Sequence, residues 1–103
     1  MQNVNPNLLH RASSCYRSQR AIDALQVMEQ SGIVVMGWKG WLRYPDGKLG
    51  HSLRHQGTAA TSQLTQTEMY AWLRSTMYKS QVEHHHHPEA SGSELLFCIT
   101  AQA

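Results

Sequence analysis

The sequence is poor in charge. Charged residues make up 16% of its 103 residues, against roughly 25% in a typical soluble domain, and the formal net charge is only +2 at pH 7. So small a basic excess argues against a dedicated nucleic-acid binder, which needs dense lysine and arginine. The surface must instead be built largely from Ser, Thr, Gln, Asn and His, and such a surface repels a partner little.

Cysteines and apolar runs are scarce as well. Cys15 and Cys98 lie near opposite ends of the chain, which excludes a multi-disulfide scaffold and a CxxC pair, although one disulfide is possible in an oxidising compartment. No apolar run approaches membrane-spanning length, and the polar start, MQNVNPNLLHRASSC, lacks the order of a signal peptide. We therefore expect a cytoplasmic protein without a membrane segment.

Recognisable catalytic motifs are also lacking: the sequence has no GxGxxG, P-loop or HExxH. Its seven acidic residues are scattered, so spacing sets no pair to share a proton, and Ser52 lacks the surroundings of a nucleophile elbow. A cysteine paired with one of seven histidines is conceivable, but nothing orders them into a site. These observations leave enzymatic activity open, favour a binding protein and imply no cofactor.

The sequence does contain the apolar residues for one small domain over residues 1–103, since 41% of it is hydrophobic. Apolar residues recur at helical spacing over 7–31, after Asn5 as a cap and Pro6 at the first helical position. Gly32 suits the end of this helix, and serines near 13–14 and 18 are points at which it could break.

A β-hairpin is predicted next, around the turn sequence YPDGK. Its first strand, 33–44, alternates with period two. One face of that strand carries Val34, Met36, Trp38, Gly40, Leu42 and Tyr44, and the other carries Val35, Gly37, Lys39, Trp41 and Arg43.

Two registers fit the second strand, 48–56. A four-residue loop pairs Tyr44 with Leu49 and buries Leu49 and Leu53, whereas a three-residue loop with a glycine bulge, favoured locally by PDG, reverses the faces. The burial of two leucines favours the first register, which also brings Arg54 beside Lys39. A bulge at one of three glycines could reconcile the registers: Gly37, Gly40 or Gly50.

The second helix is predicted from its start. Thr65 and Glu68 match a capping box, Leu64 and Met69 match a hydrophobic staple, and the helical pattern fades near 82–83. Residues 95–100, LLFCIT, predict a buried or central strand. The order α-β-β-α-β predicts an α+β two-layer sandwich, with a small, mainly antiparallel sheet and helices packed mainly on one face.

A run of four histidines follows the second helix. It is read as native, because the apolar LLFCI segment needed for the sheet comes after it. A helix end favours protonated histidine, while imidazole also suits zinc and other transition metals, although four neighbours cannot all reach one ion. The candidate metal ligands are His84, His85, His86 and His87 of the run, with His51 and His55 from the hairpin.

A cluster of aromatic and basic residues is the main functional signal. Lys39, Trp41 and Arg43 project from the face opposite Trp38, with Arg54 beside them in the favoured register. Protein hot spots and stacking platforms for nucleic acid are both built from an aromatic ring among cations. If the first helix or a cross-strand neighbour covers Trp41, the cluster is structural instead.

The function expected from these residues is binding to another macromolecule, a protein before a nucleic acid. The chain would be a small cytoplasmic regulator, or a partner that neutralises a toxin. Weak nucleic-acid binding through the basic first helix, at Arg11, Arg17 and Arg20, is one alternative. Metal handling through the histidines is the other.

Overall fold

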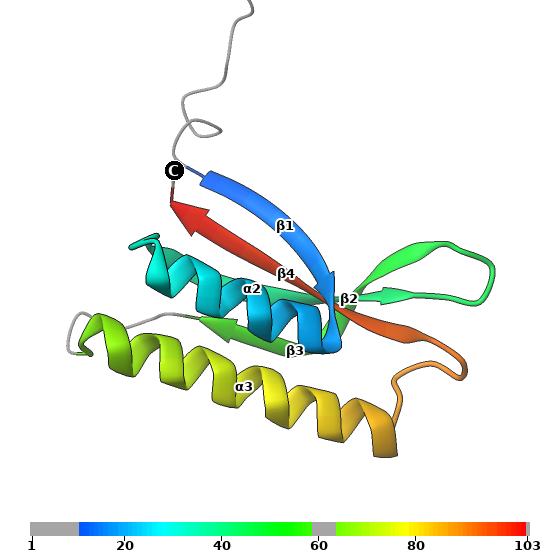
Figure 1. Ribbon diagram of the computed structural model, residues 1–103. Coiled ribbons are helices and arrows are strands. Elements are labelled where there is room, and N and C mark those ends of the chain that lie inside the picture. The colour runs from blue at the N-terminus through cyan, green and yellow to red at the C-terminus, as the bar shows by residue number, and fades with distance from the viewer. Residues whose placement is uncertain (1–10, 59–63, 103) are drawn as a thin grey trace, which may run out of the picture.

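The computed structural model describes residues 11–58 and 64–102. Its elements are β1 (Arg11–Arg17), α2 (Ser18–Gln30), β2 (Val35–Arg43), β3 (Leu49–Thr58), α3 (Gln66–His86) and β4 (Glu94–Gln102). The four strands pair antiparallel in the order β1-β4-β2-β3, and both helices lie against one face of the sheet (Figure 1). The predicted α+β sandwich is confirmed.

The sheet contains one strand more than the sequence predicted. The segment expected at the start of the first helix forms β1, which pairs with β4 along its whole length, and α2 begins only at Ser18. The helical prediction for this segment is therefore wrong. Serines such as Ser13 and Ser14 weaken a helix, whereas pairing with β4 satisfies the strand's backbone groups. The predicted helix start at Asn5 and Pro6 lies outside the described residues.

Strand β4 occupies the centre of the sheet, between β1 and β2. Phe97 and Ile99 pack in the core beneath the helices, while Leu96 and Cys98 alternate onto the opposite face and are only 6% exposed. The prediction of a central strand buried on both faces is confirmed.

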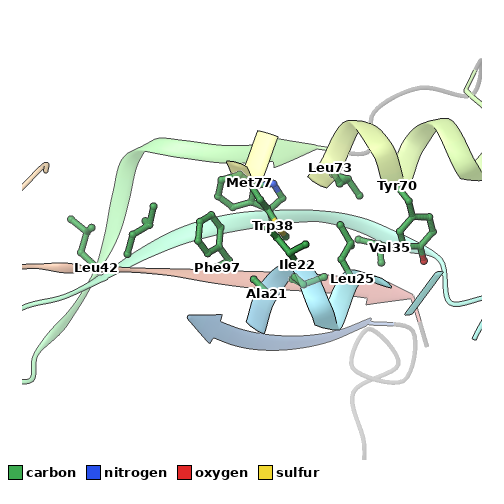
Figure 2. Packing of buried hydrophobic residues seen from close by; sticks show 12 residues of the cluster. Ala21, Ile22, Leu25, Val35, Trp38, Leu42, Tyr70, Leu73, Met77 and Phe97 are labelled. Carbon is green, nitrogen blue, oxygen red and sulfur yellow. The ribbon is translucent and has the colours of Figure 1, made fainter. Parts of the chain in front are cut away.

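The core is centred on Trp38, which is 2% exposed. Its ring meets the Phe97 ring edge-on, with 4.9 Å between the centroids, and its Nε1 donates a hydrogen bond to Thr76 Oγ1 at 2.9 Å. Figure 2 shows Trp38 and Phe97 among the buried side chains between the sheet and the helices. Because the only polar atom of the Trp38 side chain is bonded, its burial leaves no donor unsatisfied.

The β2 faces agree with the prediction from Trp38 onward but not before it. The pairing with β4 shifts between Val35 and Gly37, so that Val35 is buried while Val34 and Met36 are exposed. An extra residue in a strand exchanges its faces, which is why the simple alternation fails at this end.

The favoured hairpin register is wrong. Tyr44 N donates to Lys48 O, and Gly47 N donates to Tyr44 O, each at 2.8 Å. Gly47 has a φ of 88°, as a three-residue loop with a glycine bulge requires. Leu49 therefore pairs with Arg43 and is 56% exposed, and Leu53 is 91% exposed. The turn chemistry prevails over the burial of these two leucines.

A large bulge in β3 then brings two odd-numbered residues, His55 and Gly57, to the buried side of the sheet. Trp41 pairs with His51 and Lys39 pairs with Gln56, so four residues of β3, 52–55, stand opposite Gly40 alone. A Cβ on Gly40 would lie 2.9 Å from the His55 carbonyl oxygen, so the close approach of this bulge depends on glycine. Gly40 was one of three glycines at which the sequence predicted a bulge.

Helix α3 begins as predicted. Glu68 N donates to Thr65 Oγ1, and Thr65 N donates to Glu68 Oε1, each at 3.1 Å, which completes the capping box. The helix continues to His86, beyond the predicted end, so three of the four histidines belong to its last turn. Among the described residues, no helix is both long and apolar enough to cross a membrane.

The strand faces predict a difference between two neighbouring tryptophans. Trp38→Ala should lower the free energy of unfolding by about 2–5 kcal/mol, because it empties a core position. Leu42→Ala, at a position equally buried, should do the same, whereas the half-buried Trp41 should cost much less when truncated. Urea melts of the three variants test this, and a larger loss for Trp41→Ala would contradict the assigned faces.

The capping box at the start of α3 predicts that removing the Thr65 hydroxyl lowers the stability of the protein. Thr65→Ala removes the oxygen that accepts the Glu68 amide and should lower the free energy of unfolding by about 1 kcal/mol. Thr67→Ala is the matched control, because Thr67 is an exposed threonine in the first turn of the same helix. Equal denaturation midpoints for the two variants would show that the Thr65 cap contributes nothing.

Candidate functional site

The face of the sheet away from the helices, which we call the open face, carries the aromatic and basic residues. Lys39, Trp41 and Arg43 lie on it because they alternate with the core residues Trp38 and Leu42 along β2. The grouping of Lys39, Trp41 and Arg43 on one face agrees with the sequence prediction. No described helix packs on this side of the sheet (Figure 1).

A hollow of about 470 Å³, which we call the Trp41 hollow, lies on the open face. Its uncharged lining comes from β1, β2, β3 and β4 and consists of Cys15, Tyr16, Trp41, Leu49, Leu96 and Cys98. Three arginines also line it: Arg17, Arg20 and Arg43. The hollow thus combines a small apolar surface with guanidinium groups, which recognise carboxylates and phosphates.

One carboxylate serves two of these arginines. Arg17 Nε lies 3.3 Å from Glu94 Oε2, and Arg43 Nη1 lies 3.6 Å from Glu94 Oε1. Glu94 holds the two guanidinium groups beside the hollow without neutralising both, and Arg20 adds a third positive charge. The lining therefore has an excess of positive charge that attracts anions.

Trp41 is half-buried in the hollow. The His51 ring lies against it from the neighbouring strand, with 3.9 Å between centroids and 40° between the ring planes. Trp41 also pairs with Leu96 on its other side. A cross-strand neighbour therefore covers part of the indole, as the structural alternative required, while the remainder lines the hollow.

The structure separates Arg54 from the open-face cluster. Arg54 belongs to the β3 bulge, where its Nη2 donates to the His87 carbonyl oxygen at 2.7 Å. Its guanidinium group also lies 3.8 Å from Glu83 and 3.7 Å from Glu89. The predicted position of Arg54 beside Lys39 is wrong, because the bulge directs this side chain toward the end of α3.

Arg17 and Arg20 were both expected on the first helix, and both line the Trp41 hollow. The expectation is wrong for Arg17 and holds for Arg20. Arg17 lies in β1, on the same face as Cys15, and Arg20 lies in the first turn of α2. The side chain of Arg11 lies outside the described residues. The period-two alternation of Cys15, Tyr16 and Arg17 was the signal that could have identified this strand.

The two cysteines are bonded to each other across 83 residues of sequence. Cys15 on β1 stands directly opposite Cys98 on β4. Cys15 is exposed, whereas Cys98 is only 6% exposed. The single disulfide that the sequence allowed is therefore part of the Trp41 hollow, and Cys98 is as buried as predicted.

A second polar cluster supports the β3 bulge. Ser52 Oγ donates to Glu89 Oε1 at 2.5 Å, and Leu53 N donates to Glu89 Oε2 at 3.1 Å. Burial alone would raise the pKa of Glu89, but these hydrogen bonds and the charge of Arg54 outweigh it and lower the pKa. Because both carboxylate oxygens are occupied by the bulge, the role of Glu89 is structural.

The predicted metal ligands are divided between separate places. His51 lies on the open face against Trp41, whereas His55 and His84 approach each other beneath the bulge, with 6.1 Å between ring centroids. His85 and His86 meet each other near the end of α3, and His87 caps that helix. Within residues 11–58 and 64–102, no three His, Cys, Asp or Glu side chains are gathered so as to hold a metal ion.

His55 is the buried titratable group of the bulge, at 2% exposure. Desolvation lowers its pKa below the ordinary value of 6.5, against the opposing effect of Glu83 and Glu89. Its Nε2 is buried and has no hydrogen-bond partner among the residues that the structure describes. The neutral imidazole is therefore the form that the fold accommodates.

This burial predicts a pH dependence of stability. The unfolded chain protonates His55 near pH 6.5, whereas the folded chain resists it, so stability is full above that pH and is lost as the pH falls below it. Thermal melts between about pH 8 and pH 5.5 should show a steeper loss for the wild type than for His55→Gln. His51→Gln, at an exposed position, is the control and should retain the wild-type slope. Parallel slopes for the wild type and His55→Gln would contradict the assignment.

Comparison of the chain with protein-family models, curated proteins and solved structures finds no match. No relative therefore supplies a role for the Trp41 hollow or for the bulge. A role for these residues has to be inferred from their chemistry.

Proposed function

We propose that the chain is a small protein-binding domain that recognises an acidic partner through the open face of its sheet. The Trp41 hollow is the observation that carries the proposal, because an apolar surface beside three arginines is complementary to an apolar side chain flanked by carboxylates. Such a protein would act as a regulator, or as the neutralising partner of a toxin. A binding role of this kind requires no catalytic group.

The shape of the site favours a protein over a nucleic acid. Nucleic-acid stacking platforms present a ring on which a base can lie, but His51 covers part of Trp41. The remaining indole surface lines a hollow together with Leu49 and Leu96, and a hollow fits an inserted side chain. Aromatic and arginine residues in such pockets dominate the energetics of protein interfaces.

Binding of single-stranded nucleic acid is the second candidate. The observation that favours it is the gathering of four cations around Trp41, since Arg17, Arg20 and Arg43 line the hollow and Lys39 lies on the same face. Phosphate contacts by these residues would give an affinity that falls steeply with added salt. An interface with a protein would depend on salt mainly through its rate of association.

Two further expectations from the sequence remain predictions. The cytoplasmic location is one, and the Cys15–Cys98 disulfide counts against it, because oxidised pairs persist mainly outside the cytosol. Metal handling by the histidine run is the other. Elemental analysis after gentle dialysis tests it, and a protein free of zinc, copper and nickel would rule it out.

The test of the proposal compares two tryptophans that lie outside the core. Trp41→Ala should weaken partner binding by about 2 kcal/mol or more, roughly thirtyfold, if this ring is the anchor of the interface. Trp72→Ala is the matched control, because Trp72 is 52% exposed and lies on α3, away from the open face. Arg43→Glu should weaken binding further by repelling the partner's carboxylates.

The measurement is affinity capture from native lysate, quantified by mass spectrometry with and without nuclease, alongside urea melts of each variant. A partner lost with Trp41→Ala, kept with Trp72→Ala and insensitive to nuclease supports the proposal. Capture that nuclease abolishes would assign the face to nucleic acid. A partner that Trp41→Ala still captures at full affinity would move the binding surface elsewhere.

A further inference from the structure

The Cys15–Cys98 disulfide differs from a core disulfide in its access to solvent. Cys98 is buried in the central strand, but Cys15 is exposed on the edge strand β1. Both sulfur-bearing residues line the Trp41 hollow, so a molecule that enters the hollow meets the bond. Exposed disulfides are the ones that exchange with external thiols, whereas buried ones resist them.

The charges around the bond favour thiolate chemistry. Arg17 and Arg20 line the same hollow as Cys15, and neighbouring guanidinium groups stabilise a thiolate relative to a thiol. They also attract an anionic thiolate from solution toward the sulfur that it must attack. The arginines thus assist both the approach of a reductant and the release of the reduced cysteine.

We propose that Cys15–Cys98 is an exchangeable disulfide whose reduction weakens binding at the Trp41 hollow. A thiolate of a dithiol reductant attacks Cys15 Sγ, which forms a mixed disulfide and releases Cys98 as a thiolate that takes up a proton. The second thiolate of the reductant then attacks the reductant sulfur that is bonded to Cys15 Sγ, which closes the reductant's disulfide and releases Cys15 as a thiolate. Two electrons pass from the dithiol to the protein, and the reductant leaves as a disulfide.

The backbone pairing keeps β1 in place after reduction. β1 and β4 are paired at seven consecutive positions, of which Cys15↔Cys98 is one. Tyr16 packs against the core, and Arg17 pairs with Glu94. These contacts do not involve the sulfur atoms, so the sheet should survive while the lining of the hollow changes.

Reduction changes the hollow in two ways. Two thiols cannot approach as closely as two bonded sulfur atoms, so the surface between β1 and β4 is rearranged. A Cys15 thiolate would also place a negative charge beside Arg17 and Arg20, where it competes with the carboxylate of a partner. This effect on binding rests on the proposed function, whereas the exchange itself does not.

The exchange is tested without any partner. The folded protein is incubated with dithiothreitol for increasing times, and the free thiols are then alkylated with a maleimide. Mass spectrometry counts the maleimides on each chain, while circular dichroism monitors the secondary structure. We expect two maleimides per chain with the secondary structure retained, and slower reduction of Arg17→Gln and Arg20→Gln than of the control Lys79→Gln. Labelling that requires denaturant, or reduction that unfolds the chain, would overturn the proposal. Equal rates for the arginine and lysine variants would overturn the role of the arginines.

The effect on binding is tested with a fluorescent peptide that carries phenylalanine between glutamates. Fluorescence polarisation should give a dissociation constant at least tenfold higher for the reduced protein than for the oxidised protein. The double variant Cys15→Ser/Cys98→Ser lacks the bond but carries no thiolate, so it should bind more weakly than the oxidised protein and more tightly than the reduced one. Equal affinities of the oxidised and reduced proteins would overturn the control of binding and leave the proposed function standing. No binding by the oxidised protein would overturn the proposed function together with that control, while the exchange result would stand.

Discussion

The structure depends most on strand β4, which pairs with β1 on one side and with β2 on the other and is buried on both faces of the sheet. On the helix side, Phe97 and Ile99 complete the core. On the open face, Leu96 and Cys98 form the most buried part of the Trp41 hollow. A polar residue at any of positions 95–99 would bury a polar group on one face or the other, which costs free energy unless that group finds a hydrogen-bond partner. Stability and the proposed binding surface therefore depend on the same nine residues.

The β3 bulge is the second feature on which the structure depends, because it determines where the His55 and Arg54 side chains lie. Gly40 admits the bulge, and Glu89 holds it by accepting hydrogen bonds from Ser52 and Leu53. The bulge directs His55 into the protein and Arg54 toward α3. It also interrupts the exposed edge of the sheet, and such interruptions protect an edge from pairing with another chain.

Local signals in the sequence were sufficient for the elements that local chemistry determines. The capping box of Thr65, the alternation from Trp38 onward and the apolar run of β4 all predicted their structures. β1 was missed because its residues also fit a helical spacing, and only pairing with β4, at the other end of the described chain, decides between the two. The register was missed because the burial of leucines was weighed above the preference of the PDG turn. The Trp41 hollow could not be predicted as a unit, since its arginines come from segments assigned to different surfaces.

The junction between β1 and α2 connects the two layers with no loop between them. Arg17 is the last residue of the strand, and Ser18 is the first residue of the helix. Arg17 is also the N-cap of α2, and its side chain is held by Glu94 at the hollow. A molecule that draws Arg17 away from Glu94 would act on the extended residue that directly precedes the helix. At this edge the open face and the helical layer are joined by a single peptide bond, the one between Arg17 and Ser18.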